Sequence, residues 1–301
     1  MIKRLSGLFF VIFGVLLLTF LLIHVVPGDP IEVMLGDSAT QADRLQLRSE
    51  LGLDQPLPQQ FATYLTKVVR GDFGQSIHTK TLIAELIKTR YPATLKLAGL
   101  ALIIGLAIGV PLGIYAALKA GQWQDLLVTL LSVRLSAMPA FWLGPILMLV
   151  FAVYFGWFPV SGMESNTSII LPALTLGLGL SAILTRMTRT SLLEVLNDDY
   201  IRTARAKGLS ESTVILRHAL RAALLPIITI VGLQMGSLLA GTVITETIFS
   251  WNGIGSLLVE SIEKRDYPVT QACVLVVALS YVLVNQVTDI VYRLADPRVK
   301  G

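Results

Sequence analysis

The sequence has little charge and almost no cysteine. Charged residues make up 15% of its 301 residues, hydrophobic residues 54%, and the mean hydropathy is +0.71. Soluble domains average about 25% charged residues and about 45 to 50% apolar residues. The single cysteine, Cys273, excludes an intramolecular disulfide framework, and the three histidines are too scattered for a metal cluster. We therefore expect an all-α integral membrane protein with Cys273 packed in its interior.

Motifs for nucleotide hydrolysis and for proteolysis are also missing. No glycine is followed by lysine, so a phosphate-binding Gly-x-x-x-x-Gly-Lys-Ser/Thr loop is excluded. Neither a His-Glu-x-x-His zinc site nor a Gly-x-Ser-x-Gly nucleophile elbow occurs. The chain is predicted not to be an enzyme, with no catalytic residue, no metal site and no cofactor of its own.

Long apolar runs dominate what remains. A helix needs about 20 mainly apolar residues to cross the hydrocarbon core of a membrane. We predict six spans, at 8–26, 94–118, 126–155, 169–184, 227–248 and 271–291. A cleavable signal peptide is the alternative for the first, but no small-residue cleavage site follows Val26. Prolines such as Pro139 and Pro226 are expected to kink these helices or to mark their ends.

The basic residues indicate the orientation. They gather in alternate loops, and with the N-terminus inside the two short outer loops carry only Lys264 and Arg265. The net charge of +4 is therefore explained by membrane topology, and no nucleic-acid partner is expected. We predict an anchor helix over 1–26, an extracytoplasmic helical segment over 27–93, a five-helix core over 94–291 that includes a cytoplasmic loop at 185–225, and a cytoplasmic tail over 292–301.

The extracytoplasmic segment carries helix signals. Thr40 and Asp43 resemble a capping box, and the helix that they open would stop at Gly52. Pro58 is typical of the first turn of a second helix, and a third short amphipathic piece follows at 82–87. The second helix is expected to bury one face, formed by Phe61, Tyr64, Leu65 and Val68.

A polar stretch between the fourth and fifth spans predicts a compact elbow. Asp198 or Asp199 suits the cap of a short helix, Gly208 suits a left-handed turn that ends it, and Ser210 suits the cap of the next helix. The small side chains of Ala204 and Ala206 would keep the elbow thin enough for a groove on another protein. Charged contacts would come from Arg202, Arg205 and Lys207.

This stretch carries a resemblance to a known family. Residues 200–210, followed by 217–221 and 224–226, closely resemble the coupling loop of membrane subunits in the peptide and nickel branch of ATP-binding-cassette importers. The wider superfamily has Glu-Ala-Ala where this chain has Arg202, Thr203 and Ala204, so only the second alanine is retained. The resemblance continues through short blocks along nearly the whole chain, at 27–30, 51–56, 71–74, 245–251, 253–255, 265–269 and 296–298.

The resemblance implies the type I importer permease fold in a bacterial inner membrane. It also implies a second, homologous permease subunit, two cytoplasmic ATPase subunits that hold ATP and Mg, and an extracytoplasmic substrate-binding protein. The residues that would couple to the ATPases are Tyr200, Arg202, Thr203, Ala204, Arg205, Ala206, Lys207 and Gly208. The match is nearest the dipeptide subunits, so di- or oligopeptides are the expected cargo, with nickel, a metal chelate or glutathione as alternatives.

Polar residues near the spans are further candidates. A polar group in hydrocarbon is costly, so Gln234 or Glu246 is expected to face the translocation path, and Asn285 and Gln286 to bond between helices. Small residues such as Gly232 and Gly236 are typical of close helix packing. The candidates for an extracytoplasmic gate or docking surface are Trp251, Asp266 and Tyr267, although Trp251 and Tyr267 are equally typical of interfacial anchors.

Two other classes of function fit less well. A secondary transporter would be expected to show inverted repeats, and the two halves share no convincing repeat. A membrane-embedded enzyme would need catalytic groups converging at one depth, and no such group is evident.

Overall fold

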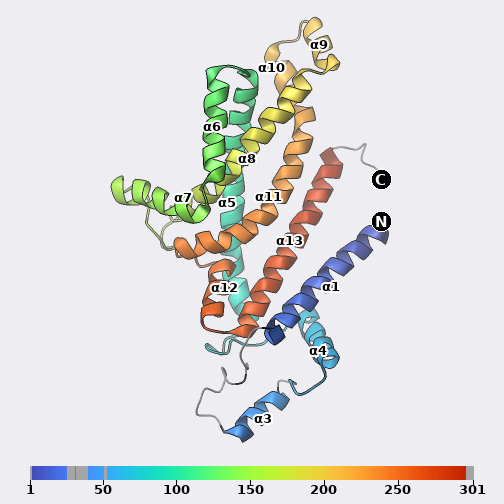
Figure 1. The fold of residues 1–301 in the computed structure, drawn as a ribbon, viewed down its shortest axis with the longest axis vertical. Helices are drawn as coiled ribbons and strands as arrows, with labels where there is room; N and C mark the ends of the chain where they lie inside the picture. Colours follow the sequence, from blue (N-terminus) through green and yellow to red (C-terminus); the bar gives the residue numbers. More distant parts are fainter. Residues whose placement is uncertain (1, 26–30, 32–39, 51–52, 296–301) are drawn as a thin grey trace. The chain divides into compact units, whose positions relative to one another are not determined.

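The computed structural model describes residues 2–25, 31, 40–50 and 53–295, and these are almost entirely helical (Figure 1). Within those residues, strand pairing is limited to an isolated bridge between Gln75 and Leu82. The helices are α1 (Ile2–Val25), α3 (Gln41–Glu50), α4 (Leu57–Val69), α5 (Ile83–Leu118), α6 (Trp123–Ala137), α7 (Ala140–Leu147), α8 (Ile170–Leu196), α9 (Asp199–Ala206), α10 (Glu211–Thr213), α11 (Leu220–Ile248), α12 (Ile254–Glu263) and α13 (Tyr267–Ala295). Two π-helices, η1 (Met148–Tyr154) and η2 (Val214–Ala219), continue α7 and α10. The predicted all-α class is confirmed.

The chain forms two compact units. The first comprises residues 1–93 and 252–282, and the second comprises residues 94–251 and 283–301. The boundary therefore falls inside α5 and again inside α13.

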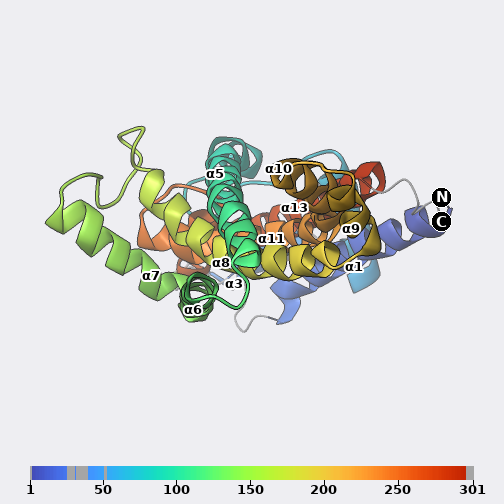
Figure 2. The same cartoon turned by 90° about the horizontal axis from the view of Figure 1, so that it is seen from above.

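The second unit is built around α8, which packs against α6, α7 and α11 (Figures 1 and 2). Close approach to α5 comes from glycine, because a Cβ on Gly109 would lie 2.7 Å from Leu184 Cβ. Gly105 and Gly113, one turn before and after, meet α8 in the same way. Small residues at this spacing let membrane helices approach closely. The glycines predicted to allow close helix packing lie in α11, and the series in α5 was not predicted.

In the first unit, α4 packs against α1. The ring of Phe61 lies 5.7 Å from Phe13 and 5.2 Å from Phe20, centroid to centroid. Tyr64 shares a hydrogen bond of 3.0 Å with Thr19. The face predicted for this helix is the one turned inward, although its four residues are half-buried and none is fully buried. A second cluster, around Ile83, Ile254 and Cys273, joins α5, α12 and α13, and Cys273 is buried as expected.

Among the described residues, four helices are long and apolar enough to cross a membrane, and a fifth span results if α6 and the α7–η1 helix count as one. The described part of α1 adds a shorter apolar stretch, Phe9–Leu21. Six crossings, the orientation and the four predicted domain ranges remain predictions. The expected helix stop at Gly52 and the tail beyond Ala295 lie outside the described residues.

Several helices differ in extent from the predicted spans. The span expected at 126–155 is broken, because α6 and α7 meet at an angle of 107°. Met138, at the break, is extended with φ −83° and ψ 118°, the conformation that a following proline favours. The piece expected at 82–87 and the span at 94–118 are one helix, α5, which continues through Pro92. The span expected to end at 184 continues as α8 to Leu196, and α11 begins at Leu220, before Pro226.

Candidate functional site

The elbow between α8 and α11 consists of α9, α10 and the turn that joins them (Figure 1). Asp198 is the N-cap of α9 and Ser210 is the N-cap of α10, as the sequence predicted. Neither side chain makes the expected capping hydrogen bond, so the caps are conformational only. Gly208 has φ +76°, the left-handed conformation predicted for it.

Apolar side chains anchor the elbow to the helices on either side of it. Ile201 and Ala204 of α9 are buried in one cluster with Ala117 of α5 and Leu192 of α8. The same cluster includes Val214 and Ala219 of η2 and Ala223 of α11. Ala204 is therefore part of the core beneath the elbow, whereas Ala206 is exposed. Buried contacts therefore connect α9 directly to α5, α8 and α11.

Polar bonds close the turn of the elbow. Arg205 donates to the Glu211 carboxylate from Nε at 3.2 Å and from Nη2 at 2.6 Å. This hydrogen bond to Arg205 holds the pKa of Glu211 below its ordinary value of 4.5 and raises the pKa of Arg205. Thr203 donates to the backbone carbonyl of Asp199 at 2.9 Å. The outward face of the elbow then consists of exposed residues, namely Tyr200, Arg202, Thr203, Ala206, Lys207 and Leu209.

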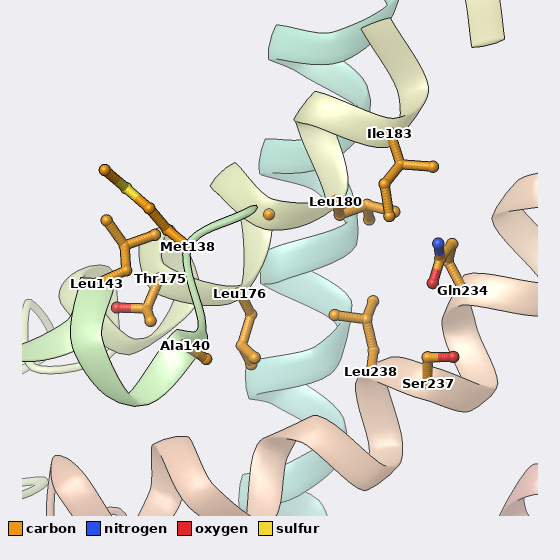
Figure 3. Close-up of a pocket in the computed structure, with 11 residues that line it drawn as sticks. Met138, Ala140, Leu143, Thr175, Leu176, Leu180, Ile183, Gln234, Ser237 and Leu238 are labelled. Carbon is orange, nitrogen blue, oxygen red and sulfur yellow. The ribbon is translucent and has the colours of Figure 1, made fainter. Parts of the chain in front are cut away.

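A cavity of about 170 Å³ lies in the second unit, between α8, α11 and the α6–α7 break (Figure 3). Its walls are mostly aliphatic, with Leu176, Leu180 and Ile183 on α8. Gln234 and Ser237 project from α11 on the opposite side. The eleven residues that line it are Met138, Ala140, Leu143, Thr175, Leu176, Gly179, Leu180, Ile183, Gln234, Ser237 and Leu238, and none of them is charged.

Comparison with known proteins identifies the family. The model of the binding-protein-dependent transport system inner membrane component matches residues 109–301, and the model of the N-terminal part of such components matches residues 1–98. The chain belongs to this family. It is thus a membrane permease subunit of a bacterial ATP-binding-cassette importer, located in the inner membrane and serving as a transport component, as predicted.

Relatives resemble the permease subunit over nearly all of its length. It is 43% identical over 299 residues to the glutathione transport system permease protein GsiC of Escherichia coli (strain K12), covering 99% of this chain and 98% of that protein. The protein of the same name from Salmonella paratyphi A (strain ATCC 9150 / SARB42) matches with the same identity and coverage.

A solved structure supports the fold. The inward-facing MetNI methionine ABC transporter has a chain that matches with a TM-score of 0.62 at 17% sequence identity, covering 70% of this chain and 96% of that one. At this identity the likeness shows the fold alone, which is that of type I importer permeases.

The two candidates for the translocation path lie in different settings within the permease subunit. Gln234 is half-buried at the cavity. Glu246 is fully buried and does not line that cavity. Its Oε1 accepts a hydrogen bond of 2.7 Å from Thr94, so it ties α11 to α5. Of the expected helix-to-helix polar residues, Asn285 is half-buried and Gln286 is exposed.

The three candidates for the outer gate or docking surface are all buried. Trp251 is 5% exposed, and its backbone N–H donates to the carbonyl of Glu246 at 2.8 Å. In the first unit, Tyr267 is 9% exposed and Asp266 is 4% exposed. Asp266 accepts hydrogen bonds from the segment at 76–77. Their neighbours Lys264 and Arg265 are exposed.

An ion pair that was not predicted from the sequence joins α6 and α8. Arg189 donates to both carboxylate oxygens of Asp125, with Nη2 2.7 Å from Oδ2. Arg189 falls within the cytoplasmic loop predicted at 185–225, and no partner was predicted for it. The one available signal was that Asp125 follows Gly121 at the start of an apolar run, a common place for an acidic residue in the first turn of a helix.

Proposed function

We propose that this permease subunit imports short peptides that an extracytoplasmic binding protein delivers. A second homologous permease subunit would complete the passage, and two cytoplasmic ATPase subunits, which hold ATP and Mg, would supply the energy. The elbow of α9 and α10 would sit in a groove of one ATPase. The segment at 27–93 would lie outside and take part in delivery.

The construction of the elbow supports the coupling role. Its exposed face carries Arg202 and Lys207, while Ile201 and Ala204 fix its inner face to the ends of α5, α8 and α11. A merely solvated basic loop would not need this buried anchorage. A close-packed core is hardly compressible, so a shift of α9 would move those helices with it.

A double substitution tests the coupling role. Arg205→Glu with Gly208→Glu reverses a charge, breaks the bond to Glu211 and places a side chain at a left-handed position. We expect the subunit to insert in the membrane but to lose co-purification with the ATPase subunits and uptake. Gly156→Glu is the control, because Gly156 is also left-handed with φ +65° and open surroundings and lies outside both the elbow and the segment at 27–93. Normal uptake by the elbow variant would refute the assignment.

Short peptides are the cargo that the observations favour. The relatives with 43% identity are named as glutathione permeases, and glutathione is itself a short peptide. The cavity has Gln234, Ser237 and Thr175 among aliphatic walls, which suits amide groups and offers no ligand set for a metal ion. Within the described residues, no cluster of three or more potential metal ligands exists.

Uptake assays decide among the cargoes. Cells that depend on this importer would be given labelled dipeptide, labelled glutathione and nickel in parallel. We expect dipeptide or glutathione uptake that vanishes when the permease gene is deleted and returns on complementation. Uptake of nickel without either peptide would overturn the proposal on cargo and would leave the elbow assignment intact.

A further inference from the structure

The Asp125–Arg189 ion pair joins α6 to α8, and these two helices differ in their contact with the elbow. The apolar cluster beneath the elbow takes residues from α5, α8, α9, η2 and α11. In the part of the chain that the structure describes, this cluster takes none from α6 or α7. A displacement of α9 is thus passed directly to α8 but has no direct apolar route to α6.

Helix α6 packs along α8, and the ion pair is the most directional part of that contact. Of the fifteen residues of α6, the buried ones are Asp125, Val128 and Ser132. Val128 makes an apolar contact, whereas Ser132 bonds within its own helix, to Val128 O at 2.8 Å. Farther along, Arg186 reaches Ser136 at only 3.4 Å. The bidentate ion pair is therefore the main directional bond between the two helices.

Asp125 is held firmly at its own end. Besides Arg189, its Oδ2 accepts the Gly121 backbone N–H at 3.0 Å, and its Oδ1 lies 3.4 Å from the Thr129 hydroxyl. Its side chain is only 7% exposed, whereas that of Arg189 is 28% exposed. The neighbouring Thr188 meets Gly113 of α5, where a glycine Cβ would lie 2.5 Å from Thr188 Cβ. At this level α8 is fixed to α5 by close packing and to α6 by charge.

At its other end, α6 leads to the cavity. It ends at Ala137, and the residues that follow, Met138, Ala140 and Leu143, form part of the cavity wall. A movement of α6 would therefore reach the wall opposite Gln234.

We propose that Asp125 and Arg189 are positioning residues that make α6 follow α8, so that displacement of the elbow is delivered through α6 to the cavity wall. This inference rests on the proposed coupling role of the elbow. Without the ion pair, α8 would still follow the elbow and α6 would keep only its packing contacts with α8. The α6 side of the cavity wall would then follow less closely, and ATP would be consumed with less transfer of cargo.

Transport measurements on the complete importer test whether the ion pair makes α6 follow α8. The variants are Asp125→Asn and Arg189→Lys, the second of which keeps the charge but loses the bidentate geometry. We expect peptide imported per ATP hydrolysed to fall by about fivefold or more in Asp125→Asn, and by less in Arg189→Lys. Arg134→Gln, which removes an exposed cation from α6, is the control and should couple like the wild type. Unchanged coupling in Asp125→Asn, or an equal loss in Arg134→Gln, would overturn the proposal.

A measurement of the distance between α6 and α8 needs no cargo and tests their connection directly. Spin labels on cysteines introduced at Trp123 and Thr190, both exposed, would report the separation of α6 and α8 in a Cys273→Ala background. In an importer that turns over ATP, we expect one distance in the nucleotide-free and ATP-bound states. Asp125→Asn should broaden it and make it depend on nucleotide. A wild-type distance that changes with nucleotide would refute the proposal that α6 follows α8. Failure of peptide uptake alone would refute only the proposed cargo.

Discussion

The carboxylate of Asp266 accepts a hydrogen bond of 2.5 Å from the Ser76 hydroxyl. The same carboxylate accepts the Ile77 backbone N–H at 3.3 Å, and the nearby carbonyl of Lys264 bonds to His78 Nε2 at 2.7 Å. These bonds fasten the segment before α5 to the turn between α12 and α13, all within the first unit. Asp266 thus stabilises the region expected to meet the binding protein, through hydrogen bonds within the first unit.

Removal of that carboxylate should loosen the segment. Asp266→Ala leaves the buried Ser76 hydroxyl without an acceptor for its proton, although the hydroxyl still accepts the Thr79 backbone N–H, at a cost of about 1–3 kcal/mol. We expect a lower thermal midpoint for the purified importer and faster proteolysis within residues 72–82. Glu263→Ala, which removes an exposed carboxylate three positions earlier, should change neither. Equal effects of the two substitutions would show that Asp266 does not specifically stabilise the segment before α5.

The glycine contact between α5 and α8 gives a second prediction. A Cβ on Gly109 would lie 2.8 Å from the Ser181 carbonyl oxygen, so Gly109→Ala forces the helices apart. The expected loss of stability is about 1–3 kcal/mol. At Gly99, on the same helix, an added Cβ would meet nothing within 4 Å, so Gly99→Ala is the matched control. Resistance to unfolding in detergent would compare them, and equal resistance would contradict the close approach.

Local features of the fold could be predicted from the sequence. The elbow helix, its N-cap position at Asp198 and the left-handed turn at Gly208 follow from residues close together in the chain. The break at Pro139 was only partly predicted. The sequence showed the proline but did not indicate whether it would kink one helix or end it.

Long-range contacts could not be predicted. Asp125 and Arg189 are 64 residues apart, and nothing in either neighbourhood specifies the other. Charge counting placed Arg189 in a cytoplasmic loop, because it ignores how far a helix extends beyond the hydrocarbon. Similarly, a buried Glu246 and a cavity-facing Gln234 are both polar groups in an apolar helix. The sequence does not show which one has a partner such as Thr94 on a neighbouring helix.

The bond between Arg205 and Glu211 gives a pH prediction. The pKa of Glu211 is lowered in the folded state, so its contribution to stability is present above the unfolded pKa and is lost as the pH falls through the lowered value. We expect a small difference in thermal midpoint between wild type and Glu211→Gln at neutral pH. The difference should shrink as the pH falls below the ordinary carboxyl range. A difference that grows on acidification would contradict the bond.

Gln234 gives the final prediction, which separates a role in transfer from a role in packing. In the described part of the chain, its side-chain amide has no hydrogen-bond partner, although it faces the cavity, so it is available to amide groups of a passing peptide. Gln234→Leu should insert and assemble normally and lower the maximal rate of peptide uptake, while ATP hydrolysis continues. Gln286→Leu makes the same change at an exposed position on α13, away from the residues that line the cavity, and should transport like the wild type. If both variants lose uptake equally, polarity within the spans matters in general and Gln234 has no special place. If neither loses uptake, cargo passes without contact with this amide, and the path lies elsewhere in the importer.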